Sequence, residues 1–200
     1  MHLTAGEFYH IYNRGNNRQP VFFNESNYLF FIKKMSEQLV PASDIICYCL
    51  MPNHFHLMIR ATEESIKTRP SFGGKAMQEF PYRVGILLSS YSQAINKQNG
   101  TTGSLFQQKT KAKILSEQVE GEKINYIESC FFYIHQNPVK AKLVASIKDW
   151  NYSSWLDYTG ERNGTLCNKI FFFNCTGLTE KDIVSRLGEN STEDDLKKFY

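Results

Sequence analysis

The sequence lacks the cysteine pattern of a disulfide-stabilised or zinc-binding protein. It contains five cysteines, an odd number, and no Cys-x-x-Cys pair. Disulfide frameworks and zinc knuckles use paired cysteines, so neither kind of site is indicated. Unpaired cysteines suit a reducing compartment, and we expect the protein to be cytoplasmic.

Long hydrophobic runs and a strong charge imbalance are also missing. No apolar run approaches the roughly 20 residues that cross a bilayer, and the N-terminus has no apolar core of a signal peptide, so we expect no membrane partner. The formal net charge is only +3, so a nucleic-acid partner would have to be bound by a local basic face. The glycine-rich, lysine-containing loop that binds ATP phosphates is absent too.

The composition is that of a soluble globular protein. With 42% hydrophobic and 22% charged residues, the 200-residue chain can bury a sizeable core. The aromatic segment 150–158 is expected to pack against the body of the fold, and capping boxes at Thr179 and Thr192 predict two short helices after it. We therefore expect one domain over residues 1–158 and a small C-terminal helical extension over residues 159–200.

Hydrophobic periodicity predicts an α+β fold. The expected order is strand, helix, strand, strand, helix, strand, which is the βαββαβ arrangement of ferredoxin-like domains, with an antiparallel sheet, helices on one face and the other face open. A third helix is expected at residues 120–136, and residues 62–81 are expected to form a long loop. The predicted strands are 7–13, two within 45–60 and 109–115, and the two helices of the unit are 25–39, capped by Asn24, and 82–97, stopped by Gly100.

Two histidines stand on one face of the second hairpin strand. Alternate side chains of a strand share a face, so His54 and His56 lie on one side, while Phe55 and its apolar neighbours face the core. Neutral imidazoles are common ligands of divalent cations. The pair is therefore a candidate half of a metal site.

Basic residues follow two other segments of the predicted sheet. An alternating stripe of lysines on strand 109–115 can form an anion-binding platform together with the histidines, or it can protect a solvated edge strand from aggregation. A polar, glycine-containing loop follows the first strand and carries two arginines. The candidate DNA-binding residues are Arg14, Arg18, Lys109, Lys111 and Lys113.

The third helix carries a tyrosine and an amide one turn apart. Tyr133 and Asn137 share a face, and Pro138 disfavours helical geometry at Asn137, so we expect the pair at the last turn of the helix. Asn137 can offer an amide oxygen to a metal, with Gln136 and His135 as alternatives. The Tyr133 hydroxyl can attack a phosphodiester that a cation polarises, which gives a phosphotyrosine and a free 3′-hydroxyl.

Four motifs resemble those of one family of enzymes. They are LMPNHFHL at residues 50–57, GSLFQ at 103–107, YIHQNPV at 133–139 and WNYSSW at 150–155. Together they resemble the single-tyrosine HUH (His-hydrophobe-His) transposases, and the YxxxNPV form is most similar to the REP-associated tyrosine transposase branch. The resemblance runs from about residue 9 to residue 158.

The resemblance implies a function, a cofactor and a partner. His54, His56 and Asn137 are expected to bind Mg²⁺ or Mn²⁺, and Tyr133 is expected to cleave single-stranded or hairpin DNA as the nucleophile. This sequence differs from the insertion-sequence branch at Asn137, where that branch usually has Gln. Family branches differ in whether the tyrosine acts in its own subunit or in a partner's, so the resemblance allows a homodimer.

Two other functions fit the same motifs. An HUH nickase for replication initiation or conjugative relaxation shares the fold and the chemistry, but a fused helicase or primase would favour it and 200 residues leave no room for one. A domesticated, non-catalytic protein that binds DNA hairpins is the third interpretation. The presence of all three expected site residues argues against loss of activity.

Overall fold

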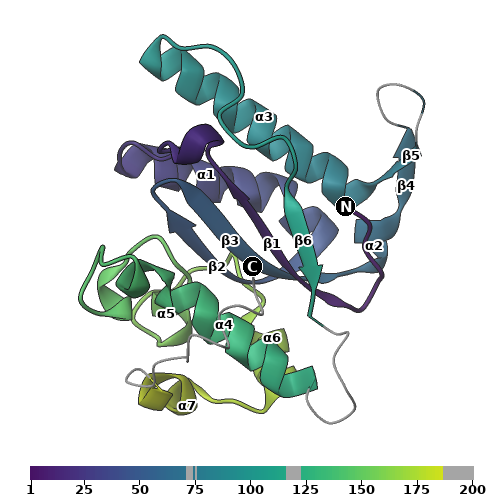
Figure 1. Cartoon of the computed structure of the whole chain (residues 1–200). Coiled ribbons are helices and arrows are strands. Elements are labelled where there is room, and N and C mark those ends of the chain that lie inside the picture. Colours follow the sequence, from purple (N-terminus) through teal and green to yellow (C-terminus); the bar gives the residue numbers. More distant parts are fainter. Residues whose placement is uncertain (71–73, 75, 116–122, 187–200) are drawn as a thin grey trace.

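A four-stranded antiparallel sheet forms the centre of the fold. The computed structural model describes residues 1–70, 74, 76–115 and 123–186 (Figure 1). The strands lie in the order β2-β3-β1-β6, and each neighbouring pair is antiparallel. This order confirms the predicted ferredoxin-like α+β fold. The bounds are β1 Phe8–Arg14, β2 Ser43–Met51, β3 His54–Ala61 and β6 Lys111–Ile114.

Two long helices cover one face of this sheet. In α1 (Glu25–Gln38), the ring of Phe31 lies 5.4 Å from that of Phe55 on β3 and 5.0 Å from that of Tyr91 in α3 (Glu79–Asn99). The Asn24 side chain accepts the predicted capping hydrogen bond from the Asn27 backbone at 3.1 Å. The helix α3 ends at Gly100, whose positive φ of 63° is a conformation that glycine adopts without strain.

The opposite face is covered in part by the C-terminal half of the chain, which corrects the expectation of an open face. The helix α4 (Lys123–Lys140) packs on β2 and β3, opposite α1 and α3 (Figure 1). The helix packs here because this face of the sheet carries apolar side chains. Cys47, Cys49 and Met58 lie on it and are fully buried, and removing such surface from water is favourable. Up to residue 186, the shorter helices that follow are α5 Trp155–Tyr158, α6 Lys169–Thr176 and α7 Glu180–Ser185.

Two local predictions were wrong. Part of the expected loop 62–81 is ordered as α2 (Glu63–Ile66) and a hairpin of β4 (Thr68–Pro70) and β5 (Ala76–Gln78). The helix α4 also continues past Asn137, whose carbonyl accepts a hydrogen bond from the Ala141 backbone at 2.9 Å. Pro138 has no N–H to donate to the Ile134 carbonyl, and the Asn137 side-chain amide donates to that carbonyl instead at 3.3 Å. The described residues also form short 3₁₀ helices at Asn16–Arg18, Val40–Ala42 and Ile147–Asp149.

The C-terminal segment is attached to the body by aromatic packing. Tyr152 stacks on Tyr28 of α1 with 3.7 Å between ring centroids, and Phe172 of α6 stacks on Phe131 of α4 at 4.5 Å. The predicted capping box at Thr179 is present, whereas the one at Thr192 lies outside the described residues. The domain boundary at residue 158 stays a prediction. None of the helices in the described ranges could serve as a membrane span.

Candidate active site

The strand register gathers the histidines and the lysines on one face. In antiparallel strands, directly opposite residues point to the same side. His54 lies opposite Arg14 and His56 lies opposite Tyr12. On the other edge of β1, Lys111 lies opposite Tyr12, and Lys113 lies opposite His10. Lys111 and Lys113 of the predicted stripe therefore share the face of the histidines, whereas Lys109 precedes β6, which begins at Lys111 and not at residue 109 as predicted.

A third histidine, His10, belongs to this site and has no predicted role. Its Nε2 lies 2.8 Å from His56 Nδ1, within hydrogen-bond distance, and the two rings stack at 5.0 Å between centroids. Both side chains are buried, with exposed fractions of 0% and 1%. The alternation of strand 7–13 places His10 on the face of Tyr12, but only the pairing of β1 with β3 brings it to His56.

Both predicted histidine ligands have one ring nitrogen within hydrogen-bond distance of a neighbour. His54 Nδ1 lies 2.6 Å from Asn53 Oδ1, and the Asn53 amide nitrogen donates to the Arg18 carbonyl at 3.1 Å. An amide oxygen only accepts, so His54 Nδ1 carries the hydrogen and its Nε2 keeps a lone pair. His56 Nε2 is buried and has no hydrogen-bond partner among the described residues. This arrangement, with the second nitrogen fixed, is typical of metal-binding histidines.

The surroundings keep both imidazoles neutral. Burial, followed by the charge of Arg14, lowers the pKa of His54 to about 4. Burial also lowers the pKa of His56 well below its usual value, with further contributions from His10, His54 and Arg14. Neutral imidazole is the form that binds a cation, so the pair is ready to act as a ligand at neutral pH.

The donor set fits a cation that takes two imidazoles and oxygen ligands. No group of three His, Cys, Asp or Glu side chains in the described part of the chain is placed to hold a metal. Asn137 donates its Nδ2 hydrogens to the carbonyls of Tyr133 at 2.9 Å and Ile134 at 3.3 Å. Its Oδ1 is then the atom that can face a cation. Asn137 makes no hydrogen bond to His54 or His56, and its role as the third ligand stays a prediction.

Among the alternative third ligands, His135 has a structural role. Its Nδ1 lies 2.8 Å from the Phe131 carbonyl and its Nε2 lies 2.9 Å from Ser154 Oγ. Ser154 also accepts a hydrogen bond from the Tyr48 backbone, so His135 ties α4 to the 150–155 motif and to β2. With both nitrogens engaged, His135 is not available to a metal. Gln136 is buried on the same helix.

The structure brings Tyr133 directly onto the histidines. Its ring meets those of His56 and His10 edge-on, at 5.6 Å and 5.8 Å between centroids, with interplanar angles of 82° and 81°. The exposed fraction of Tyr133 is only 1%. The Lys140 ammonium lies 5.9 Å from the centroid of the same ring. The candidate nucleophile and the candidate metal ligands of one chain are therefore neighbours.

A basic cavity of about 190 Å³ opens beside the pair. Its walls include three cationic side chains and no carboxylate, so it favours an anion. The predicted residues Arg14, Lys109 and Lys111 line it, together with Tyr12, Asn13, Gln107 and the two predicted histidine ligands.

The two remaining basic residues lie outside this cavity. Lys113 is close to the Cys130 thiol of α4, where its charge opposes the rise in the pKa of that thiol caused by burial. Arg18 is exposed in the 3₁₀ turn after β1, and it does not line the basic cavity.

Comparisons with known proteins support the fold. No protein-family model and no curated protein matches the sequence. A solved structure of a REP-associated tyrosine transposase bound to a REP hairpin is similar, with a TM-score of 0.50 and 17% sequence identity over 77% of this chain and 79% of that one. The chain therefore has the fold of a REP-associated tyrosine transposase, the family whose motifs its sequence resembles.

Proposed function

We propose that this chain is a metal-dependent transposase that cleaves and rejoins single-stranded DNA beside hairpin ends through a 5′-phosphotyrosine at Tyr133. The observation that carries the proposal is the contact of the Tyr133 ring with His56 and His10 of the same chain. The similarity in fold to a transposase bound to a DNA hairpin supports the choice of substrate.

The cavity beside the histidines supplies the binding site for the phosphodiester. Arg14, Lys109 and Lys111 attract the phosphate, and no acidic side chain of the cavity opposes them. His54 and His56 would hold Mg²⁺ or Mn²⁺, with Asn137 as the proposed third ligand. A bound cation would polarise the phosphodiester and stabilise the charge that develops on it.

Tyr133 performs the covalent step. The phenol gives up its proton, and its oxygen attacks phosphorus and forms the new O–P bond. The bond from phosphorus to the 3′-oxygen breaks, and that oxygen leaves as a 3′-hydroxyl after taking up a proton. The Lys140 ammonium near the ring favours negative charge on the attacking oxygen. The reverse reaction rejoins a strand, so the bond energy is conserved and no ATP is consumed.

Burial of Tyr133 adds one requirement to this mechanism. With 1% of its surface exposed, the side chain meets a phosphodiester only after α4 moves away from β1 and β3. The two partners of the contact belong to one chain, which favours cleavage in cis and makes a homodimer unnecessary for this step.

A covalent-adduct assay tests the proposal. Single-stranded DNA with a hairpin and its flanks is incubated with protein and Mn²⁺, and an adduct that survives denaturation is sought. Tyr133→Phe should form none and should still bind the DNA. The matched control is Tyr126→Phe, another buried tyrosine of α4, which should react normally. An undiminished adduct with Tyr133→Phe would assign the nucleophile elsewhere.

The burial of Tyr133 also favours a second candidate, a non-catalytic protein that binds DNA hairpins. The same assay separates the two. Tight binding of the hairpin without any adduct, with Mn²⁺ and Mg²⁺ alike, would select the second candidate.

A further inference from the structure

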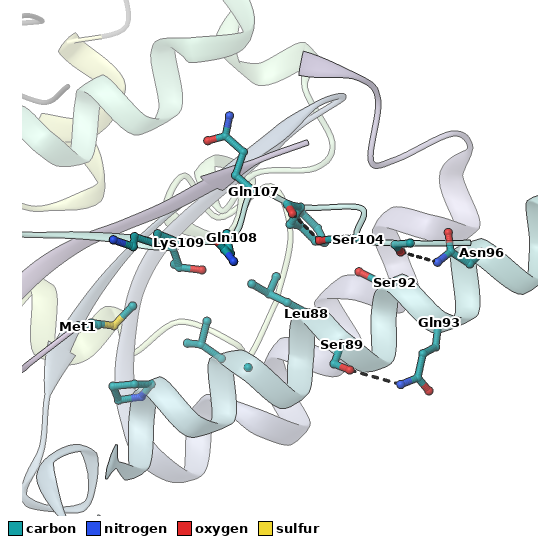
Figure 2. Close-up of a pocket in the computed structure, with 16 residues that line it drawn as sticks. Met1, Leu88, Ser89, Ser92, Gln93, Asn96, Ser104, Gln107, Gln108 and Lys109 are labelled. Carbon is teal, nitrogen blue, oxygen red and sulfur yellow. Dashed lines mark hydrogen bonds between the residues drawn. The ribbon is translucent and has the colours of Figure 1, made fainter. Parts of the chain in front are cut away.

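A second, larger cavity lies between α3 and the segment 103–110. It encloses about 830 Å³, and we call it the α3 groove (Figure 2). From α3, its wall includes Gly85, Leu88 and Ser92, and from the facing segment it includes Gln107, Gln108 and Lys109. None of the residues that line it is acidic. This volume is within the usual range for ligand sites.

The α3 groove adjoins the candidate active site. Gln107 and Lys109 line both the groove and the basic cavity that holds His54 and His56. The segment that carries them is fixed to β1, because the Gln107 backbone donates to the Arg14 carbonyl at 2.9 Å. Gln107 and Lys109 therefore connect the two cavities.

The chemistry of the groove suits the edges of bases. Figure 2 shows the side chains of Gln108 and Ser92 pointing into the space between α3 and the segment 103–110. The side-chain amides of Gln107 and Gln108 make no hydrogen bond within the described part of the chain. An amide offers both a donor and an acceptor, which is what the edge of an unpaired base requires, and Lys109 offers a charge for the backbone.

The groove is also built before any ligand arrives. Asn96 of α3 donates from Nδ2 to the Gly103 carbonyl at 2.8 Å and accepts at Oδ1 from the Thr101 hydroxyl at 3.0 Å. These bonds hold the start of the facing segment on the end of α3. A site fixed in this way loses little conformational entropy on binding.

Gly85 keeps the groove open at a cost in helix stability. Glycine inside a helix is about 1 kcal/mol less favourable than alanine. A Cβ added at Gly85 would meet no atom within 4 Å, so packing within the chain does not require glycine at this position. The absent side chain instead leaves open space at this part of the groove wall.

We infer that the α3 groove binds the unpaired nucleotides that flank the phosphodiester at the histidines. This inference rests on the proposed function. It means that the DNA substrate is single-stranded on this side of the phosphodiester. The volume of the groove is sufficient for one or two unpaired nucleotides. Gln108 contacts a base edge, and Lys109 contacts a phosphate between the two cavities.

Binding measurements without chemistry test the inference. The background is Tyr133→Phe in EDTA, and the probes are a fluorescent single strand of mixed sequence and the same sequence as a duplex, followed by anisotropy. Gly85→Leu should narrow the groove and weaken single-strand binding at least tenfold, and Gln108→Ala should weaken it about threefold to tenfold. The control is Ser36→Leu at an exposed position of α1, which should change the dissociation constant by less than twofold.

Each outcome has a definite meaning. Thermal unfolding of Gly85→Leu should occur at or above the wild-type temperature, because a helical glycine is replaced in open space. Wild-type affinity of that variant for the single strand, or a loss confined to the duplex, would overturn the inference. Because no cleavage is measured, failure of the wild-type protein to form a Tyr133 adduct would refute the proposed cleavage and leave the groove assignment unaffected.

Discussion

His10 Nε2 and His56 Nδ1 lie 2.8 Å apart in the buried layer between the sheet and α4. This contact occupies the nitrogen of His56 that does not face the proposed cation, and it sets the orientation of the ring. Partners of this kind in metal sites typically contribute 10- to 100-fold to metal affinity. His10 is thus a positioning residue for the proposed function, acting through His56.

Replacement of His10 tests this role. His10→Phe keeps an aromatic ring for stacking on Tyr12, whose centroid is 4.8 Å away, and removes the bond to His56. We expect Mn²⁺ to bind 10- to 100-fold more weakly, as measured by titration calorimetry in the Tyr133→Phe background. Tyr12→Phe is the control and should bind Mn²⁺ normally. Equal affinity of His10→Phe and wild type would remove His10 from the site.

Replacement of the proposed ligands should have a larger effect. His54→Ala and His56→Ala each remove one of two imidazoles, and we expect adduct formation to fall at least 100-fold in each. Addition of EDTA to the wild-type protein should give the same loss. Adduct formation by His54→Ala at the wild-type rate, in Mn²⁺ or in EDTA, would end the assignment of the metal site.

The lysine stripe should appear in the salt dependence of DNA binding. Each phosphate contact to a single strand contributes about 0.7 to the slope of log K against log salt. A triple alanine variant of Lys109, Lys111 and Lys113 should therefore lower the slope by about 2. The control is a triple alanine variant of three exposed lysines elsewhere, Lys33, Lys148 and Lys181. An unaltered slope in the first variant would make the stripe a solvated strand edge.

Buried His135 should make the fold sensitive to acid. Burial lowers the pKa of His135 to about 4, against an ordinary value near 6.5. The unfolded chain then binds a proton that the folded chain does not, so stability is complete above pH 6.5 and is lost as the pH falls toward 4. The contribution of this one group is about 3 kcal/mol across that window.

Urea unfolding at pH 7, 6 and 5 measures this loss. His135→Gln, which cannot take up the proton, should show a smaller decrease in the free energy of unfolding over the same range. The same decrease in the variant and in the wild-type protein would show that other groups cause the acid sensitivity.

The sequence by itself determined the local geometry of the site. The two-residue period of a strand places His54 and His56 on one face, the cap at Asn24 and the glycine at position 100 mark helix ends, and helical spacing puts Tyr133 one turn from Asn137. These relationships depend on backbone geometry within a few residues, which is the same in every protein. Four motifs in order were sufficient to indicate the fold.

Only the tertiary structure decided which of these local features meet. The bond between His10 and His56 depends on the register of β1 against β3, and the contact of Tyr133 with both depends on α4 covering buried Cys47, Cys49 and Met58. Two further features likewise depend on tertiary packing, which local sequence propensity does not predict. They are the continuation of α4 past Pro138 and the hairpin within residues 62–81. Contacts between distant segments are set by the burial of shared apolar surface, and the period of a single segment contains no information about its partner.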